Sequence, residues 1–268
     1  MKELVVGALQ LPTLGVNTSR LEFYIKKAKE RDCSLLLFGE YVTNHFFKEL
    51  INMPKNMVKE QTNSHIAILK RFSKEYDITF VAPIVEVKGK RYYKKIVKIS
   101  PKSLSYYTQQ LLINYPHWNE EEFFSNPIKP LSDPLSFTIN GFKVGVMFGF
   151  EIHFDKLWQY ILQKRVDLVL LPTATTFNSQ YRWRELISMR AFLNNCYILR
   201  ANRVGDFIED GVKWHFYGDS MLVNPNGVIE MNLEDKESML IESVSKEVLS
   251  ESRRGWRFRH HLAKRGEI

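Results

Sequence analysis

The feature that most constrains the fold is a series of short, nearly continuous apolar segments that alternate with segments of helical periodicity. Leu4–Leu11 and Leu168–Leu171 are apolar at almost every position, which is typical of strands buried on both faces. Thr18–Arg31 places its apolar side chains on one helical face, and the next buried run is Ser34–Phe38. This alternation predicts sheets packed together with helices on their outer sides, a layered α/β architecture.

The rest of the chain continues the alternation without a low-complexity linker. We expect a hairpin over 137–150 that turns at Asn140-Gly141, a long loop over 114–134, and a short helix followed by a basic tail. Because no internal boundary is visible, we predict one domain over residues 1–268, with the tail starting at about residue 252. The other predicted helices are 62–76, 154–165 and 182–194, and the other predicted strands are 79–87, 92–99, 104–108, 167–171, 197–202, 220–223, 228–231 and 238–242.

Composition restricts the setting in which the protein works. No apolar run in the 268 residues is long enough to cross a bilayer, and the first segment lacks the pattern of a signal peptide. We therefore expect a cytoplasmic protein without membrane insertion. The two cysteines, Cys33 and Cys196, are too few for a disulfide framework, and we expect both to be buried and unreactive. No Cys or His has the spacing of metal ligands, so we expect no metal and no cofactor.

The formal net charge of +8 comes largely from basic clusters at Lys88–Lys102 and Arg253–Arg265. Such clusters can contact nucleic acid, an anionic membrane surface or an acidic partner. Charge alone identifies no partner, and the chain has neither an RNA-binding signature nor a zinc-finger spacing. We interpret the clusters as solvated surface and do not expect nucleic-acid binding.

Gly149 lies where a segment of this kind would expose a nucleophile. Residues 143–158 are typical of a buried strand, a sharp turn and a helix. In enzymes such a turn presents a reactive side chain beside backbone N–H groups that hold an oxyanion. Glycine has no side chain with which to attack. The segment therefore predicts the architecture of an enzyme without its reactive atom.

Five ordered segments resemble the nitrilase superfamily, the carbon–nitrogen hydrolases. The resemblance extends from the first strand to about Trp256 and implies a four-layer αββα sandwich of the nitrilase type. The segments start at Leu4, Leu35, Val144, Asp167 and Arg190, and read LVVGALQLP, LLLFGEY, VGVMFGFEI, DLVLLPTA and RAFLNNCYILRANRVG.

The resemblance also implies a site. Members of the family use a Glu–Lys–Cys triad, in which the thiolate attacks an amide or nitrile carbon, the glutamate moves the proton and the lysine stabilises the oxyanion. The glutamate corresponds to Glu40. The lysine position falls on Gln109, or on the adjacent Gln110, and the cysteine position falls on Gly149. A site without thiol and cation would form no covalent intermediate, and losing one member of such a set already removes most of the rate.

Other site residues follow from the same resemblance. A second glutamate that supports the lysine corresponds to Glu120 or Glu121, and Phe150, Glu151 and Thr173 are candidates for the remaining pocket. Aromatic side chains could instead fill the pocket, and the candidates are Trp118, Phe148, Phe150 and Phe177.

Members of the family usually pair through the helices that flank the elbow, so we expect a homodimer or a larger homo-oligomer. Here those helices are 154–165 and 182–194. The side chains that would give these helices an apolar outer side are Trp158, Tyr160, Ile161, Trp183 and Leu186, although aromatic residues at helical spacing are more often ordinary core.

Three functions remain open at this point. The first is a catalytically inactive homologue, a pseudoenzyme that binds or scaffolds an unidentified protein or small-molecule partner. The second is a hydrolase of amide-type or nitrile-type C–N bonds in which Glu40 activates water without a thiol. The third is a nucleic-acid-associated protein that uses the basic tail.

Two residues also have purely structural interpretations. Glu40 could be a carboxylate satisfied by backbone groups at a strand end, because a buried carboxylate needs a partner in either case. Gly149 could relieve a backbone conformation that other residues adopt at a cost.

Overall fold

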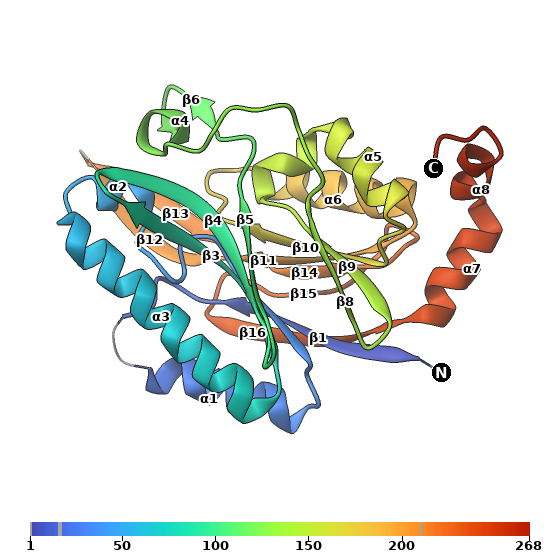
Figure 1. Ribbon diagram of the computed structural model, residues 1–268, viewed down its shortest axis with the longest axis horizontal. Helices are drawn as coiled ribbons and strands as arrows, with labels where there is room; N and C mark the ends of the chain where they lie inside the picture. The colour runs from blue at the N-terminus through green and yellow to red at the C-terminus, as the bar shows by residue number, and fades with distance from the viewer. Residues whose placement is uncertain (1, 16–17, 210) are drawn as a thin grey trace.

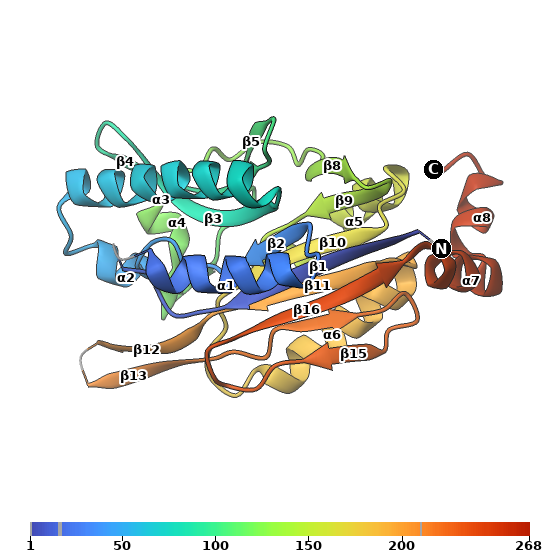
Figure 2. The same ribbon diagram turned by 90° about the horizontal axis from the view of Figure 1, so that it is seen from below.

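Two six-stranded sheets lie face to face, and helices cover both outer sides (Figure 1, Figure 2). The computed structural model describes residues 2–15, 18–209 and 211–268. The predicted four-layer αββα architecture is confirmed. No helix within these described ranges is long and apolar enough to cross a membrane.

The first sheet has the strand order β16-β1-β2-β3-β4-β5. The three inner strands β1, β2 and β3 are parallel, and the remaining neighbours are antiparallel. In chain order the strands are β1 (Glu3–Gln10), β2 (Leu35–Phe38), β3 (Thr79–Lys88), β4 (Arg91–Ile99), β5 (Leu104–Thr108) and β16 (Ser238–Ser245).

The second sheet has the strand order β15-β14-β11-β10-β9-β8. Its inner strands β9, β10 and β11 are again parallel. In chain order the strands are β8 (Leu135–Ile139), β9 (Phe142–Val146), β10 (Leu168–Thr173), β11 (Tyr197–Asn202), β14 (Met221–Val223) and β15 (Ile229–Asn232).

The apolar strands explain the layers, because successive side chains of a strand point to opposite faces. In β2, Leu35 and Leu37 join the core between the two sheets, whereas Leu36 and Phe38 pack against the outer helices α1 (Ser19–Glu30) and α3 (Lys55–Tyr76). In β10 the same alternation separates the inter-sheet core from α5 (Asp155–Gln163) and α6 (Gln180–Asn194). Strands buried on both faces therefore need apolar side chains at every position, which is the pattern in the sequence.

Shorter elements surround one end of the sandwich. They are α2 (Phe47–Leu50), β6 (Asn114–Tyr115), β7 (Trp118–Asn119), α4 (Glu120–Phe123), and the hairpin β12 (Val204–Glu209) and β13 (Val212–Tyr217). The hairpin extends beyond the sheets in Figure 2. The chain ends in α7 (Lys246–Trp256) and α8 (Phe258–Ala263), so the predicted basic tail is helical.

Three sequence predictions need correction. The helix predicted at 62–76 begins at Lys55, because the polar first turns carry little apolar periodicity. The predicted loop 114–134 contains β6, β7 and α4. The hairpin β12–β13 was not predicted, although Asp210-Gly211 between two alternating segments is a hairpin signal in the sequence.

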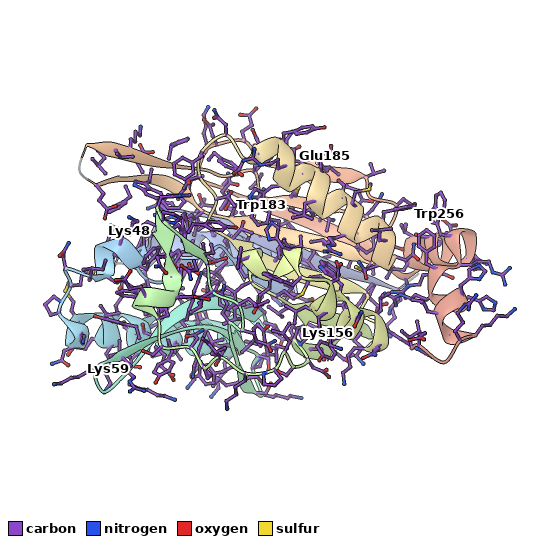
Figure 3. All side chains as sticks on the ribbon, turned by 90° about the horizontal axis from the view of Figure 1, so that it is seen from above. Lys48, Lys59, Lys156, Trp183, Glu185 and Trp256 are labelled. Carbon is purple, nitrogen blue, oxygen red and sulfur yellow. The ribbon has the colours of Figure 1, made fainter. Side chains whose placement is uncertain are left out.

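The apolar side chains expected on the outer sides of α5 and α6 mostly point elsewhere. Trp158 and Ile161 are only 3% and 2% exposed, because they pack under α5 against the second sheet. Trp183 and Leu186 line a cavity beside η1 (Gly149–His153), a 3₁₀ helix, and Figure 3 shows Trp183 on α6. The exposed apolar side chains of α6 are instead Tyr181, Met189 and Leu193.

Candidate active site

Glu40 lies just beyond the end of β2, where the first sheet meets the end of β10 in the second sheet. Its backbone N–H donates to the carbonyl of Thr173 at 3.1 Å, which fixes the residue between the two sheets. The residue is 5% exposed, so its carboxylate is almost removed from water. A carboxylate at this depth needs charged or polar partners.

Lys94 on β4 is the main partner of Glu40. Its Nζ lies 2.5 Å from Oε2 of Glu40 and 2.6 Å from Oε1 of Glu120, and its side chain is 3% exposed. The expectation that this site has no cation is therefore wrong. Lys94 faces inward on β4 with its neighbours Tyr92 and Ile96, so a charged residue on the apolar face of a strand was the signal in the sequence.

Glu120 is the second carboxylate that binds Lys94. Its Oε1 accepts hydrogen bonds from the Tyr41 hydroxyl at 2.7 Å and from the Trp118 indole N–H at 3.2 Å, in addition to Lys94. The residue is fully buried, whereas Glu121 is exposed and accepts from the side chain of Asn114. Glu120 is therefore the glutamate that supports the lysine here.

Burial and the neighbouring charges shift the pKa values of Glu40 and Lys94 within this triad of Glu40, Lys94 and Glu120. Burial raises the pKa of Glu40, and the Glu120 carboxylate adds to that effect while Lys94 opposes it. Burial alone would lower the pKa of Lys94, but the carboxylates of Glu120 and Glu40 raise it above its usual value. The ammonium therefore stays protonated at neutral pH, next to a carboxylate whose basicity is increased.

Gln109 and Gln110 serve other contacts. The backbone N–H of Gln109 donates to the carbonyl of Lys94 at 3.1 Å, which places the two residues side by side on adjacent strands. Its side-chain amide donates to the carbonyl of Leu111 at 2.7 Å. Gln110 binds the Tyr107 hydroxyl and the backbone of Ser132.

Gly149 begins the turn after β9, so the predicted strand, turn and helix are confirmed. Its N–H donates to Oε1 of Glu40 at 3.3 Å. Its φ lies outside the left-handed region, so the backbone does not require glycine and the strain interpretation is wrong. The surroundings are restrictive instead, because an added Cβ would lie 2.7 Å from Cγ2 of Thr173 and 3.2 Å from Oε1 of Glu40.

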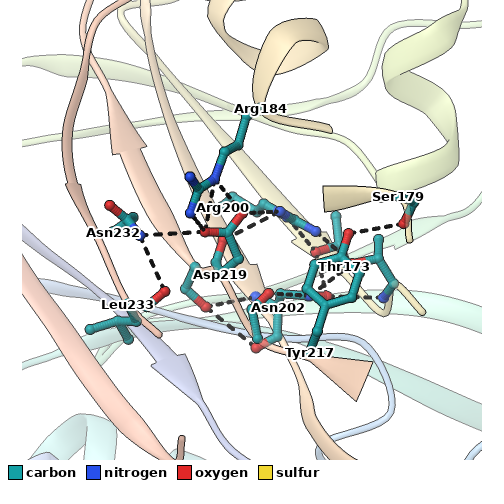
Figure 4. A network of polar contacts seen from close by, with 12 residues as sticks. Thr173, Ser179, Arg184, Arg200, Asn202, Tyr217, Asp219, Asn232 and Leu233 are labelled. Carbon is teal, nitrogen blue, oxygen red and sulfur yellow. Dashed lines mark hydrogen bonds and ion pairs between the residues drawn. The ribbon is translucent and has the colours of Figure 1, made fainter. Parts of the chain in front are cut away.

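A buried polar network holds Thr173 in this position (Figure 4). Its hydroxyl accepts from Nε of Arg200 at 3.0 Å and donates to Oδ1 of Asn202 at 2.9 Å. Arg200 is fully buried, and it also donates to Thr175 at 2.6 Å and to the carbonyl of Asp219 at 3.3 Å. Rotating Thr173 would break two buried hydrogen bonds, so its methyl group stays directed at Gly149.

Glu151 lies outside the cavity and holds the turn that carries Gly149 through hydrogen bonds. The carboxylate accepts from the N–H groups of Phe148 at 2.9 Å and Gln110 at 2.7 Å, and from the Tyr107 hydroxyl at 3.0 Å. Burial raises its pKa to about 7, against the lowering effect of these donors. It therefore links β5 to the turn that carries Gly149.

An open cavity of about 280 Å³ lies in front of Glu40 and Lys94. Of the aromatic residues expected to fill it, Trp118 and Phe150 form walls, whereas Phe148 lies beside Lys94 in the core and Phe177 is 52% exposed. Thr173 lines the floor. The cavity is therefore not blocked by aromatic side chains.

Neither cysteine lines this cavity. Cys33 and Cys196 are both buried, and burial raises the pKa of their thiols to about 12 and about 11. In the described part of the chain, no three His, Cys, Asp or Glu side chains are arranged to hold a metal ion.

Comparison with known proteins gives one family. The family model "Carbon-nitrogen hydrolase" matches residues 5–254. A curated relative, the deaminated glutathione amidase of Synechocystis sp., is 23% identical over 94% of this chain and 96% of its own length. A carbon-nitrogen hydrolase structure from Helicobacter pylori G27 superposes with a TM-score of 0.82 at 20% identity, over 96% of this chain and 94% of that one.

A second solved structure is relevant to a site without a cysteine. It is a cysteine-to-alanine mutant of the amidase from Nesterenkonia sp. AN1, described in complex with butyramide. It superposes with a TM-score of 0.75 at 18% identity, over 94% of this chain and 97% of that one.

Proposed function

This chain belongs to the carbon-nitrogen hydrolase family, and from that premise we propose that it binds a small amide in the cavity beside Glu40 without forming a covalent intermediate. The observation that carries the proposal is an open cavity that ends on a buried Glu40–Lys94 pair but has Gly149 at the nucleophile position. The protein is then a binding member of a family of enzymes.

The donors and acceptors at the cavity floor match an amide. An ammonium group has three N–H donors, and two of those of Lys94 bind Glu40 and Glu120. The third can donate to a ligand carbonyl oxygen. Oε1 of Glu40 accepts only the 3.3 Å bond from Gly149 among the interactions that the structure describes, so it can also accept from an amide NH₂ group. The complex of butyramide with a cysteine-to-alanine amidase supports amide binding in such a site.

No other side chain at the floor is set up as a nucleophile. The Thr173 hydroxyl already donates to Asn202, and the Ser179 hydroxyl donates to the carbonyl of Thr176 at 2.8 Å. Activating either hydroxyl would need a nearby general base, and neither donates to a carboxylate or an imidazole. Among the described residues, no hydroxyl that lines the cavity donates to a general base, which argues against covalent catalysis.

The raised pKa of Glu40 favours a second candidate function, the direct hydrolysis of an amide. Glu40 would take a proton from water as the water oxygen attacks the carbonyl carbon, and would return it to the leaving amine as the C–N bond breaks. Lys94 would stabilise the oxyanion. This route needs no thiol, but it lacks the acceleration that covalent catalysis provides.

Calorimetric titration with butyramide tests the proposal. We expect saturable binding to the wild type and at least roughly tenfold weaker binding to Glu40→Gln, because glutamine has one oxygen acceptor and an NH₂ donor and so cannot accept both from Lys94 and from the ligand NH₂ group at separate oxygens. Glu86→Gln is the control, since Glu86 pairs with Lys95 at 2.6 Å on the same sheet but lies outside the cavity. The absence of binding to the wild type would contradict the proposal.

Ammonia release separates the two functions. We expect none above the rate in buffer for wild type and Glu40→Gln alike. Release by the wild type that Glu40→Gln abolishes and Glu86→Gln preserves would establish the water-activating route instead.

A further inference from the structure

A second cavity of about 550 Å³ adjoins the first, and three rings form much of its wall. The ring centroids of Trp214 and Phe177 lie 5.1 Å apart, and that of His117 lies 5.6 Å from Phe177 and 6.2 Å from Trp214. Rings at these spacings offer faces and edges to a further aromatic ring.

The two cavities share a thin partition. Tyr115 lines the first cavity and His117 lines the second, and their rings stack with centroids 5.9 Å apart. On the other side, Ala174 and Thr175 line the first cavity, while Phe177 of the same segment lines the second. A ligand held at Lys94 therefore needs to extend past only one layer of side chains to reach the second cavity.

The partition is exposed rather than packed into the core. Tyr115 is 45% exposed and Phe177 is 52% exposed. Phe177 also has a φ of 59°, a left-handed conformation that a bulky residue adopts at a cost. In this conformation the ring lies beside that of Trp214.

The charges at the second cavity are already neutralised. Lys48 on α2 pairs with Glu209 at 2.5 Å and lies 4.9 Å above the ring of Trp214. Figure 3 shows Lys48 at this end of the molecule. Because the charge of Lys48 is paired with that of Glu209, the cavity presents mainly ring surface, which suits a neutral group.

From these features, and resting on the proposed amide binding, we propose that the ligand is an amide with a neutral aromatic tail. The amide head binds Glu40 and Lys94 in the first cavity. The tail passes the Tyr115–His117 partition and lies against Trp214, Phe177 and His117. The second cavity thus determines which amides the protein selects.

Calorimetry with two ligand sets tests this inference. The first set is acetamide and butyramide, which fill only the head site. The second is a series of ω-phenylalkanamides of increasing chain length. We expect affinity to rise at least roughly tenfold once the chain is long enough to carry the ring past the partition. Phe177→Ala should remove most of this gain and leave butyramide affinity unchanged.

Phe23→Ala is the matched control, since Phe23 is 57% exposed on α1. It should keep the full gain. A series whose affinity is flat with chain length, while butyramide binds, would overturn the aromatic tail and leave the proposed function intact. A gain that survives Phe177→Ala would also overturn it. If no amide of either set binds, the proposed function itself fails.

Discussion

Introducing a cysteine at position 149 should destabilise the protein unless the Thr173 side chain is made smaller at the same time. The Cβ of Gly149→Cys would lie 2.7 Å from Cγ2 of Thr173 and 3.3 Å from the carbonyl of Pro172. Arg200 and Asn202 hold the Thr173 hydroxyl, so the methyl group cannot turn aside cheaply. Overpacking of this kind costs about 1–3 kcal/mol, which lowers the melting temperature by roughly 2–5 °C for a chain of this size.

Thr173→Ser is the matched partner, because it removes the obstructing methyl group and keeps the hydroxyl in the network. Alone it should cost about 1 kcal/mol for the lost methyl packing. In the double variant the two costs should not add, and the coupling measured by urea unfolding should be at least about 1 kcal/mol. If Gly149→Cys is as stable as the wild type, or if the two costs add, the steric argument is refuted.

Alkylation of the folded variants gives an independent test. Cys33 and Cys196 are buried, and burial raises the pKa of their thiols to about 12 and about 11, so the folded wild type should not react with iodoacetamide at neutral pH. The double variant Gly149→Cys, Thr173→Ser should take up one label, at position 149, only if the new thiol faces the cavity. Labelling of the wild type at a comparable rate would contradict the assigned burial.

Three further predictions concern charge and assembly. Lys94→Met should lower the free energy of unfolding by about 3–5 kcal/mol at neutral pH, because it leaves two buried carboxylates without their cation. Lys95→Met, which breaks a partly exposed ion pair, should cost no more than about 1 kcal/mol. Urea unfolding of the two variants measures both losses, and equal losses would contradict the argument. Burial raises the pKa of Glu151 from 4.5 to about 7, so between those values the folded state holds a proton that the unfolded chain has released, and it loses up to roughly 3 kcal/mol as pH rises through that window. The stability of Glu151→Gln relative to wild type should therefore increase from pH 4.5 to pH 7, and a pH-independent difference would refute it. We also propose a homodimer through α6, where Leu193 is 52% exposed, and expect Leu193→Asp to reduce the mass seen by light scattering to that of one chain.

The layers were predictable because burial on both faces leaves a direct record in the sequence. Leu35–Phe38 needs apolar residues on alternate sides for the inter-sheet core and for the outer helices. Glu40 was predicted from the resemblance to the carbon–nitrogen hydrolases, and Gly149 from that resemblance together with the strand-and-turn pattern around it. Each lies shortly after a buried strand. The hairpin β12–β13 was missed although its sequence carries a hairpin signal, the pair Asp210-Gly211 between two segments of alternating polarity.

Lys94 was missed because matching the residues of one segment to the family gives no information about side chains on the neighbouring strand. Gln109 beside β5 and Lys94 on β4 are joined by a backbone hydrogen bond, but only the Lys94 side chain binds the Glu40 carboxylate, whereas that of Gln109 binds the carbonyl of Leu111. Matching the strand near Gln109 position by position therefore predicts a site without a cation, although Lys94 on the adjacent strand supplies one. The inward register of Lys94 was the one local sign of it.

The site therefore contains a cation, Lys94, but has no room for a side chain at position 149. Stability does not explain the triad, because a buried ion pair contributes less than well-packed apolar side chains of similar volume. Glu40, Lys94 and Glu120 nevertheless lie at the floor of an open cavity, with two of them on its surface. At position 149 the space for a side chain is instead occupied by a methyl group that a buried arginine holds in place. A buried charged pair beside an open cavity, with no room for a side chain at position 149, is the arrangement on which our proposal of non-covalent amide binding rests.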